Sequence, residues 1–149
     1  MYNIKKAELS DLDRISPLFD AYRIFYNYPS DIEEAQKFLK DRMTKNESEI
    51  FLALTSSGTA IGFTQLYPLF SSTRMKRLWL LNDLYVEDIH RGKGVSVMLI
   101  DAAKKLCLDT GACALTLETA KTNFIGNNLY IKTGFNLDQD HNYYEWTNK

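Results

Sequence analysis

The segment from residue 91 to residue 97 has the residue types and spacing of a phosphate site. It reads Arg91-Gly92-Lys93-Gly94-Val95-Ser96-Val97 and follows an apolar stretch that ends at Val86. Glycine lets a backbone approach a ligand without a Cβ in the way. Apolar residues at helical spacing predict a helix over 95–110, whose first N–H groups have no helical acceptor. The segment therefore predicts a site for phosphate or pyrophosphate, and Arg91 and Lys93 add positive charge there.

Two common nucleotide-binding motifs do not fit this loop. A Walker loop needs Gly-x-x-x-x-Gly-Lys-Ser/Thr, which the chain does not contain. A dinucleotide fingerprint needs Gly-x-Gly-x-x-Gly, and Val97 stands where its third glycine would be. The remaining pattern is Arg91-x-x-Gly94-x-Ser96, placed shortly after an apolar strand.

Composition sets broad bounds on the class of protein. With 149 residues, we predict a single domain over 1–149. A net charge of −1 argues against a nucleic-acid partner, and no apolar run is long enough for a membrane span. Cys107 and Cys113 form no metal-binding pattern, so we expect no metal. Two thiols without a secretory signal indicate a reducing compartment, and we expect a cytoplasmic protein.

The chain alternates between strand and helix patterns in one order. We predict helices that begin at capping boxes over 10–13 and 30–33, and further helices over 95–110 and 123–132. Strands are predicted over 2–7, 49–54, 60–67, 75–86 and 112–119, with a loop over 68–72 and a final antiparallel pair over 135–137 and 143–147. The order β-α-α-β-β-β-α-β-α-β-β predicts a mixed α/β (α+β) fold with a mostly antiparallel sheet flanked by helices.

Two spaced motifs resemble the GCN5-related N-acetyltransferase (GNAT) superfamily. Leu84-Tyr85-Val86 followed by Arg91 to Ser96 is similar to its signature Arg/Gln-x-x-Gly-x-Gly/Ala, with Ser96 where Gly or Ala is usual. Asn123 to Phe135 resembles its Asn-x-x-Ala-x-x-Leu-Tyr-x-x-x-Gly-Phe, with Gly126 in the Ala position. Two motifs in the right order are more specific than either alone.

The resemblance implies acetyl-CoA as the acetyl donor. The pyrophosphate would accept hydrogen bonds from the backbone N–H groups of residues 92–97. The strand edge at Leu84 and Val86 would pair with the acetyl carbonyl and the pantetheine arm. Asn123 would also bond to this arm, and Tyr130 would protonate the leaving thiolate, because tyrosine carries its proton at neutral pH.

The residue that takes a proton from the amine is less clearly marked. A primary amine with a pKa of about 10.4 must lose a proton before it attacks. Some family members carry a Glu where this chain has Asn82. By strand alternation we expect Asp83 on the opposite sheet face, paired with Arg74, Lys76 or Arg77. Glu118 is the preferred base, and a water chain is an equal alternative.

A weaker resemblance concerns the acceptor side. The segment around Tyr22 and Tyr26 is similar to a histone- and polyamine-acetylating subgroup. With Tyr28, these side chains would line an amine pocket together with Asn82, and aromatic faces attract cations. Aromatic residues at 143, 144 and 146 favour a homodimer.

We therefore predict an N-acetyltransferase that moves an acetyl group from acetyl-CoA to a primary amine by direct attack in a ternary complex. The acceptor is a small amine, a polyamine or a lysine side chain of a protein. The alternative is a CoA-binding sensor or regulatory module without turnover, for which Asn82 in place of a carboxylate is the main argument.

Overall fold

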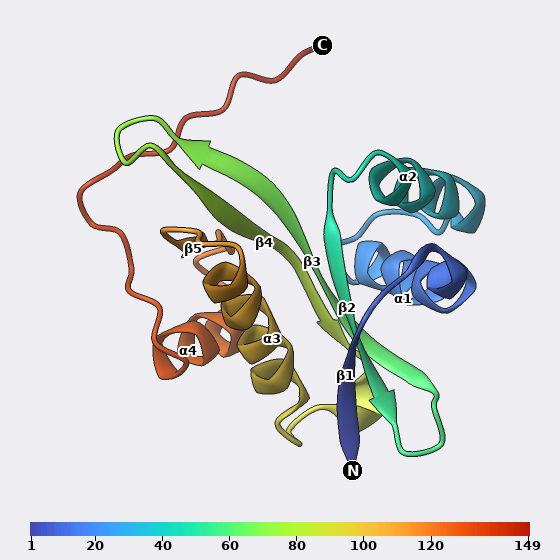
Figure 1. Ribbon diagram of the computed structural model, residues 1–149. Helices are drawn as coiled ribbons and strands as arrows, with labels where there is room; N and C mark the ends of the chain where they lie inside the picture. Colours follow the sequence, from blue (N-terminus) through green and yellow to red (C-terminus); the bar gives the residue numbers. More distant parts are fainter. The chain divides into compact units, whose positions relative to one another are not determined.

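A sheet of five strands forms the centre of the first part of the chain (Figure 1). The computed structural model describes residues 1–149, which divide into two compact units, Met1–Glu118 and Thr119–Lys149. The first unit contains β1 (Tyr2–Lys6), α1 (Leu12–Phe25), α2 (Ile32–Thr44), β2 (Glu49–Thr55), β3 (Ala60–Ser71), β4 (Lys76–Val86), α3 (Val95–Asp109) and β5 (Leu115–Thr116). The second unit contains α4 (Phe124–Lys132).

The strands lie in chain order, β1-β2-β3-β4-β5. The first four pair antiparallel, and β5 pairs parallel with β4. The predicted mixed and mostly antiparallel architecture is confirmed. The pairing with β5 is short, because only Trp79 and Leu80 of β4 have partners there. The stretch from Leu81 to Val86 therefore has a neighbouring strand on its β3 side alone.

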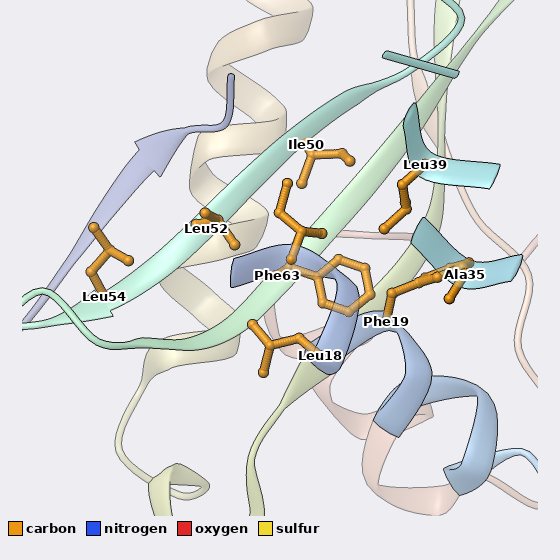
Figure 2. Packing of buried hydrophobic residues seen from close by; sticks show 9 residues of the cluster. Leu18, Phe19, Ala35, Leu39, Ile50, Leu52, Leu54 and Phe63 are labelled. Carbon is orange, nitrogen blue, oxygen red and sulfur yellow. The ribbon is translucent and has the colours of Figure 1, made fainter. Parts of the chain in front are cut away.

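Helices cover both faces of this sheet (Figure 1). On one face, α1 and α2 pack on β2 and β3 around Phe63, which is fully buried. Figure 2 shows the side chains that meet there, namely Leu18, Phe19, Ala35, Leu39, Ile50, Leu52 and Leu54 around Phe63. On the other face, Val95 and Leu99 of α3 pack against Ala53, Ile61 and Val86. The core thus holds α1 and α3 against the same strand region.

The first two helices begin at other residues than the sequence motifs predict. The reciprocal capping box forms between Glu8 and Asp11 at a 3-10 turn over Leu9–Asp11, instead of between Ser10 and Asp13. Asp31 caps α2 by accepting from the Glu34 N–H (3.1 Å), so the predicted box at Ser30 is wrong. At each observed cap, a side chain accepts a hydrogen bond from a backbone N–H group that has no acceptor within the helix.

Ser30 instead ties the start of α2 to α1. Its hydroxyl donates to Oδ2 of the buried Asp20 (2.7 Å), and the Asp31 N–H donates to Oδ1 of the same carboxylate (2.8 Å). Charge-assisted bonds of this kind are stronger than neutral ones. They hold in place the connection between the helices, which carries Tyr28.

Strand β3 is longer than the sequence predicts. Residues 68–72 were expected to form a loop, but β3 continues to Ser71 and pairs with β4 down to Lys76. Pro68 is tolerated because β2 pairs with β3 only as far as Leu66, which leaves the rest of β3 at a sheet edge. A proline, which has no N–H to donate, is accepted at an edge strand.

The predicted final strand pair does not form. The second unit has no strand after α4, and the segment after residue 132 contains no helix either. The Asp138 carboxylate accepts from the N–H of Asp140 (2.9 Å) and contacts Nδ1 of His141 (2.8 Å), which makes a local turn. An isolated two-stranded pair is marginal in water, so short strands need a neighbouring strand to form.

Three further observations bear on the class of protein. None of the helices has the length and apolar character that crossing a membrane requires. No three His, Cys, Asp or Glu residues are grouped in a way that could hold a metal ion. Cys107 and Cys113 are free thiols.

Gly62 controls how closely β3 approaches the end of β4. A Cβ at this position would lie 2.8 Å from the Tyr85 carbonyl oxygen, which is backbone and cannot rotate away. We expect Gly62→Ala to lower the free energy of unfolding by about 1–3 kcal/mol, measured by urea denaturation. Lys37→Ala on the exposed face of α2 is the control, expected within about 0.5 kcal/mol. Equal stability of the two variants would contradict the close approach.

Candidate active site

Strand β4 contains a β-bulge at Asn82. Leu81 pairs with Leu66 and Asp83 pairs with Gln65, so Asn82 is an extra residue with no partner on β3. A bulge breaks the strict alternation of side chains and bends the strand. As a result, Asn82 and Asp83 both line one cavity, although they are neighbours in the chain. The prediction that Asp83 faces away from Asn82 is wrong for this reason.

The cavity lies where α1 and α2 meet the bulge, and it has a volume of about 450 Å³. Most of its wall is aromatic. It is lined by Phe19, Tyr22, Arg23, Tyr26, Tyr28, Phe38, Tyr67, Asn82 and Asp83. The four residues predicted to line the amine pocket, Tyr22, Tyr26, Tyr28 and Asn82, thus come together here. A concave, mostly apolar site with few polar groups is the usual form of a small-molecule pocket.

Asp83 is the acidic residue of this cavity, and it is only 3% exposed. Its Oδ2 accepts from Nε2 of Gln65 (2.6 Å), and its Oδ1 accepts from Nδ2 of Asn82 (3.0 Å). Burial raises the pKa of the Asp83 carboxyl above its ordinary value, and the bonds from Gln65, Tyr22 and Asn82 partly offset this. A carboxylate with a raised pKa is a stronger base than an exposed one.

Neighbouring hydroxyl groups respond to the same burial and charge. Burial, followed by the charge of Asp83, raises the pKa of Tyr67 and of Tyr26. Both phenols therefore keep their protons at neutral pH. The Tyr22 hydroxyl donates to the Asn82 carbonyl oxygen (3.3 Å), which links α1 to the bulge.

The predicted ion pair of Asp83 with Arg74, Lys76 or Arg77 does not form. Arg77 stacks on the rings of Phe70 and Trp79 instead. No cationic side chain lies within ion-pair distance of the Asp83 carboxylate. Isolated buried charges are unfavourable unless something neutralises them. A positively charged group of an occupant is therefore favoured beside this carboxylate.

Glu118, the residue preferred as base from the sequence, has different surroundings. Strand β5 ends at Thr116, two residues earlier than Glu118, whereas the sequence predicts a strand to residue 119. The Glu118 side chain is exposed and is not part of the cavity wall. Its role as base stays a prediction.

Beyond the bulge, the outer edge of β4 is open. The Glu87 N–H donates to the Ile61 carbonyl on β3 (2.9 Å). Because successive N–H groups of a strand alternate in direction, those of Leu84 and Val86 point away from β3. No strand pairs with β4 on that side past Leu80. The backbone N–H groups of Leu84 and Val86 thus point to the open side of β4, where no neighbouring strand accepts a hydrogen bond from them.

The loop before α3 has the backbone that its glycines predict. Gly92 and Gly94 have φ angles of +73° and +83°, and Gly94 is the N-cap of α3. These angles lie in the left-handed region, which glycine adopts without strain. The first i→i−4 bond of α3 runs from the Met98 N–H to the Gly94 carbonyl (3.1 Å). The N–H groups of 95–97 precede it and have no acceptor within the helix.

Arg91 attaches this loop to the end of β4. Its Nε donates to the Val86 carbonyl (2.7 Å), and its guanidinium pairs with Asp88 and lies over the rings of Phe25 and Tyr85. Lys93 is exposed. Arg91 therefore helps to set the geometry of the loop, whatever contact it makes with a ligand.

In the second unit, Asn123 is the N-cap of α4. Its Oδ1 accepts from the Gly126 N–H (3.1 Å), and its Nδ2 donates to Oγ1 of Thr119 (2.9 Å). A Cβ at Gly126 would collide with the Asn123 amide, which accounts for glycine at that position. Tyr130 lies on α4 with its ring against Phe135, the centroids being 5.8 Å apart. The proposed contacts of Asn123 and Tyr130 with a ligand stay predictions.

Sequence reasoning did not place five cavity residues there, namely Phe19, Arg23, Phe38, Tyr67 and Asp83. Phe38 belongs to the apolar stripe of a helix, and that pattern does not distinguish core from cavity. Asp83 depends on the bulge, which no sequence pattern marks. The sequence did offer a sign for Arg23, because this residue lies close to Tyr22 and Tyr26 on the same helix.

Comparison with known proteins identifies the family. The model of the acetyltransferase (GNAT) family matches residues 15–135. The chain belongs to the GNAT family of acetyltransferases. The match includes both motifs quoted above and the strands, helices and loop that form the site.

Similar proteins agree with this assignment. The chain is 46% identical over 136 residues, covering 91% of each chain, to an uncharacterized N-acetyltransferase, YhfO, of Bacillus subtilis strain 168. It is 32% identical over 140 residues, covering 94% of each chain, to a probable acetyltransferase of Haemophilus influenzae. A crystal structure of a probable acetyltransferase superposes with a TM-score of 0.94 at 38% identity, covering 99% of this chain and 98% of the other.

The burial of Asp83 predicts a pH-dependent effect on stability. Its folded pKa lies above the unfolded value, so the folded state binds more protons and stability falls as pH rises through that window. The Asp83→Asn variant has no carboxyl group to ionise at this position, so it does not lose stability in this way. We expect the variant to gain stability relative to the parent protein between pH 3 and pH 7, measured by urea denaturation.

The substitution is sterically mild, because Oε1 of Gln65 has no partner and the amide can turn to accept from the new Asn. Asp101→Asn on the exposed face of α3 is the control, and its stability difference should change less with pH than that of Asp83→Asn. If the stability difference between Asp83→Asn and the parent protein is constant across this pH range, the Asp83 pKa lies at its ordinary value in the folded state.

Proposed function

We propose that the protein is an N-acetyltransferase that transfers the acetyl group of acetyl-CoA to a primary amine by direct attack in a ternary complex. The observation that carries the proposal is the position of a buried carboxylate, Asp83, in an aromatic cavity at the bulge of β4. Leu84 follows it directly, on the strand whose outer edge is open. A base for an amine and hydrogen-bond donors for a carbonyl thus lie on consecutive residues of one strand.

The first unit contains groups suited to the donor. The loop at Gly92 and Gly94 and the free N–H groups at the start of α3 suit a pyrophosphate, since they combine close backbone approach with the positive end of a helix. The outward N–H groups of Leu84 and Val86 suit the carbonyl oxygens of an extended acyl-pantetheine arm, which can bond to a strand edge as another strand would.

Asp83 prepares the acceptor in this scheme. An amine enters as an ammonium ion, because the pKa of a primary amine is about 10.4. The buried carboxylate and the aromatic faces favour that cation. The apolar wall lowers the pKa of the ammonium and raises that of Asp83, so transfer of a proton to Asp83 becomes less unfavourable than in water. The neutral nitrogen then has a lone pair for attack.

The attack forms a C–N bond at the thioester carbonyl. Breaking of the C–S bond then expels the thiolate, and the nitrogen releases its remaining extra proton to solvent as it becomes an amide. The N–H groups of Leu84 and Val86 stabilise the negative charge on the carbonyl oxygen, because they are fixed by the strand before the reaction begins. We propose that Tyr130 donates a proton to the leaving thiolate and that Asn123 bonds to the pantetheine arm, as the family motif implies. Glu118 stays a second candidate for the base.

Further proposals concern the organisation of the protein. We propose that residues 1–149 form one acetyltransferase domain, since the family match crosses the boundary between the two units. A homodimer is favoured by the exposed Tyr143, Tyr144 and Trp146 of the second unit. The free thiols suit the cytoplasm, where thiols stay reduced. Light scattering at several concentrations measures the assembly.

The test of the function is release of free thiol from acetyl-CoA in the presence of an amine panel of amino acids, polyamines and lysine peptides. We expect turnover that depends on an added amine. Binding of acetyl-CoA without thiol release for any amine would contradict an enzyme and favour the CoA-binding regulatory module. The buried carboxylate next to Asn82 argues for the enzyme, because it supplies the base that the motif itself lacks.

The glycine loop provides a test of the donor site. Ala at position 94 is strained by about 1–2 kcal/mol, because φ is positive there, and its Cβ projects from the loop backbone. We expect Gly94→Ala to raise the KM for acetyl-CoA about tenfold or more. Gly111→Ala is the matched control, since Gly111 has a φ of +67° at the other end of α3. Equal KM values in the two variants would contradict the site.

The proton-transfer roles are tested by three substitutions. We expect Asp83→Asn to lower kcat/KM for the amine by about 100-fold or more, the usual effect of losing a general base. Tyr130→Phe should lower kcat by a similar factor with little change in the KM for acetyl-CoA. Glu118→Gln should have little effect. The reverse result, loss with Glu118→Gln and none with Asp83→Asn, would assign the base to Glu118.

A further inference from the structure

The acceptor cavity contains two opposite charges that are not paired with each other. Asp83 and Arg23 both line it, and neither takes part in an ion pair of the protein. Ordinarily, charges in a confined site are paired, since pairing offsets their loss of water. Two unpaired charges of opposite sign in one cavity therefore point to an occupant with both signs.

Two contacts hold the Arg23 guanidinium in place, and they leave most of its N–H donors available to a ligand. Its Nη1 donates to the Pro29 carbonyl (3.0 Å), and its carbon lies 5.5 Å from the centre of the Tyr28 ring. An arginine has five N–H donors, so most of them stay available. A fixed guanidinium is suited to a carboxylate, which it binds through two parallel hydrogen bonds.

A nearby arginine shows the contrast. Arg42 lies over the Phe38 ring at 4.8 Å, and its Nε pairs with the Glu47 carboxylate (3.1 Å). Its charge is thus balanced within the protein, and it is not part of the cavity wall. Arg23 stacks on an aromatic ring in a similar way but has no acidic partner. Of these two arginines, Arg23 is the one that lines the cavity and has no acidic partner, whereas Arg42 lies outside the cavity wall and pairs with Glu47.

We propose that the acceptor is a small amino acid or a close analogue of one, with its primary amine at Asp83 and its carboxylate at Arg23. This inference rests on the proposed function and specifies the substrate class of the same cavity. The volume of about 450 Å³ is large enough to hold such a molecule, and the aromatic wall suits an apolar middle section between two charged ends.

The same charges disfavour the other acceptors considered. A polyamine carries a second ammonium group, which the Arg23 guanidinium repels within the cavity. A lysine side chain of a peptide brings an amine but no carboxylate on the same short chain, and so leaves Arg23 unpaired. The carboxylate is therefore the group that distinguishes the expected acceptor.

The experiment compares each free amino acid with its carboxamide, in which the negative charge is removed and the amine is kept. With acetyl-CoA and purified protein, we expect at least one amino acid to exceed its amide in kcat/KM by about 10- to 100-fold, the range for a charge-assisted bidentate pair. Arg23→Gln should bring this ratio close to one, and Arg23→Lys should give an intermediate ratio. Arg42→Gln is the control and should leave the ratio intact.

The outcomes separate this inference from the proposed function. Amides or polyamines that react as well as the amino acids, or an unchanged ratio in Arg23→Gln, would overturn the inference and leave the acetyltransferase standing. If no amine is acetylated, the proposed function fails, and calorimetric binding of the same acid and amide pairs decides the inference. Tighter binding of the acid that Arg23→Gln abolishes supports it, and equal binding overturns it.

Discussion

One extra residue in β4, Asn82, determines which side chains reach the cavity and which backbone N–H groups of the strand face its open outer edge. In a regular strand, Asn82 and Asp83 would lie on opposite faces of the sheet. The bulge brings both into the wall between α1, α2 and the strand, and the Tyr22 hydroxyl bonds to the bulge itself. Because side-chain and backbone directions along a strand depend on its register, the positions of Leu84 and Val86 depend on the same residue.

The burial of Asp83 connects stability with chemistry. A carboxylate in an aromatic cavity without a cationic partner is unfavourable for folding, because its ionised form loses water and gains only neutral hydrogen-bond donors. The same loss of water makes the Asp83 carboxylate a stronger base and favours a cation beside it. The surrounding core, with fully buried Phe63, Leu39 and Ile50, supplies the stability that allows such a residue to be kept.

The donor side of the site is built in another way, from backbone rather than from side chains. Left-handed glycines, unsatisfied N–H groups at the start of α3 and outward N–H groups of β4 are all consequences of local chain geometry. Arg91 joins them, since its Nε holds the Val86 carbonyl at the end of the strand. Backbone donors recognise parts of a ligand that are common to many reactions, whereas the cavity side chains decide which amine is accepted.

The sequence by itself determined the features that are local in the chain. Apolar spacing and the glycines after Val86 were enough for most strands and helices and for the loop before α3, because these depend on residues a few positions apart. The two motifs added the family. The tertiary structure decided the cavity: only strand pairing reveals the bulge at Asn82, and only the packing of α1 and α2 brings Arg23 and Tyr67 to the same space as Asp83. The length of β3 depended on its pairing with β4, and Ser30 bonds to Asp20 of α1 instead of capping α2. The final strand pair lacked the neighbouring strand that would have stabilised it.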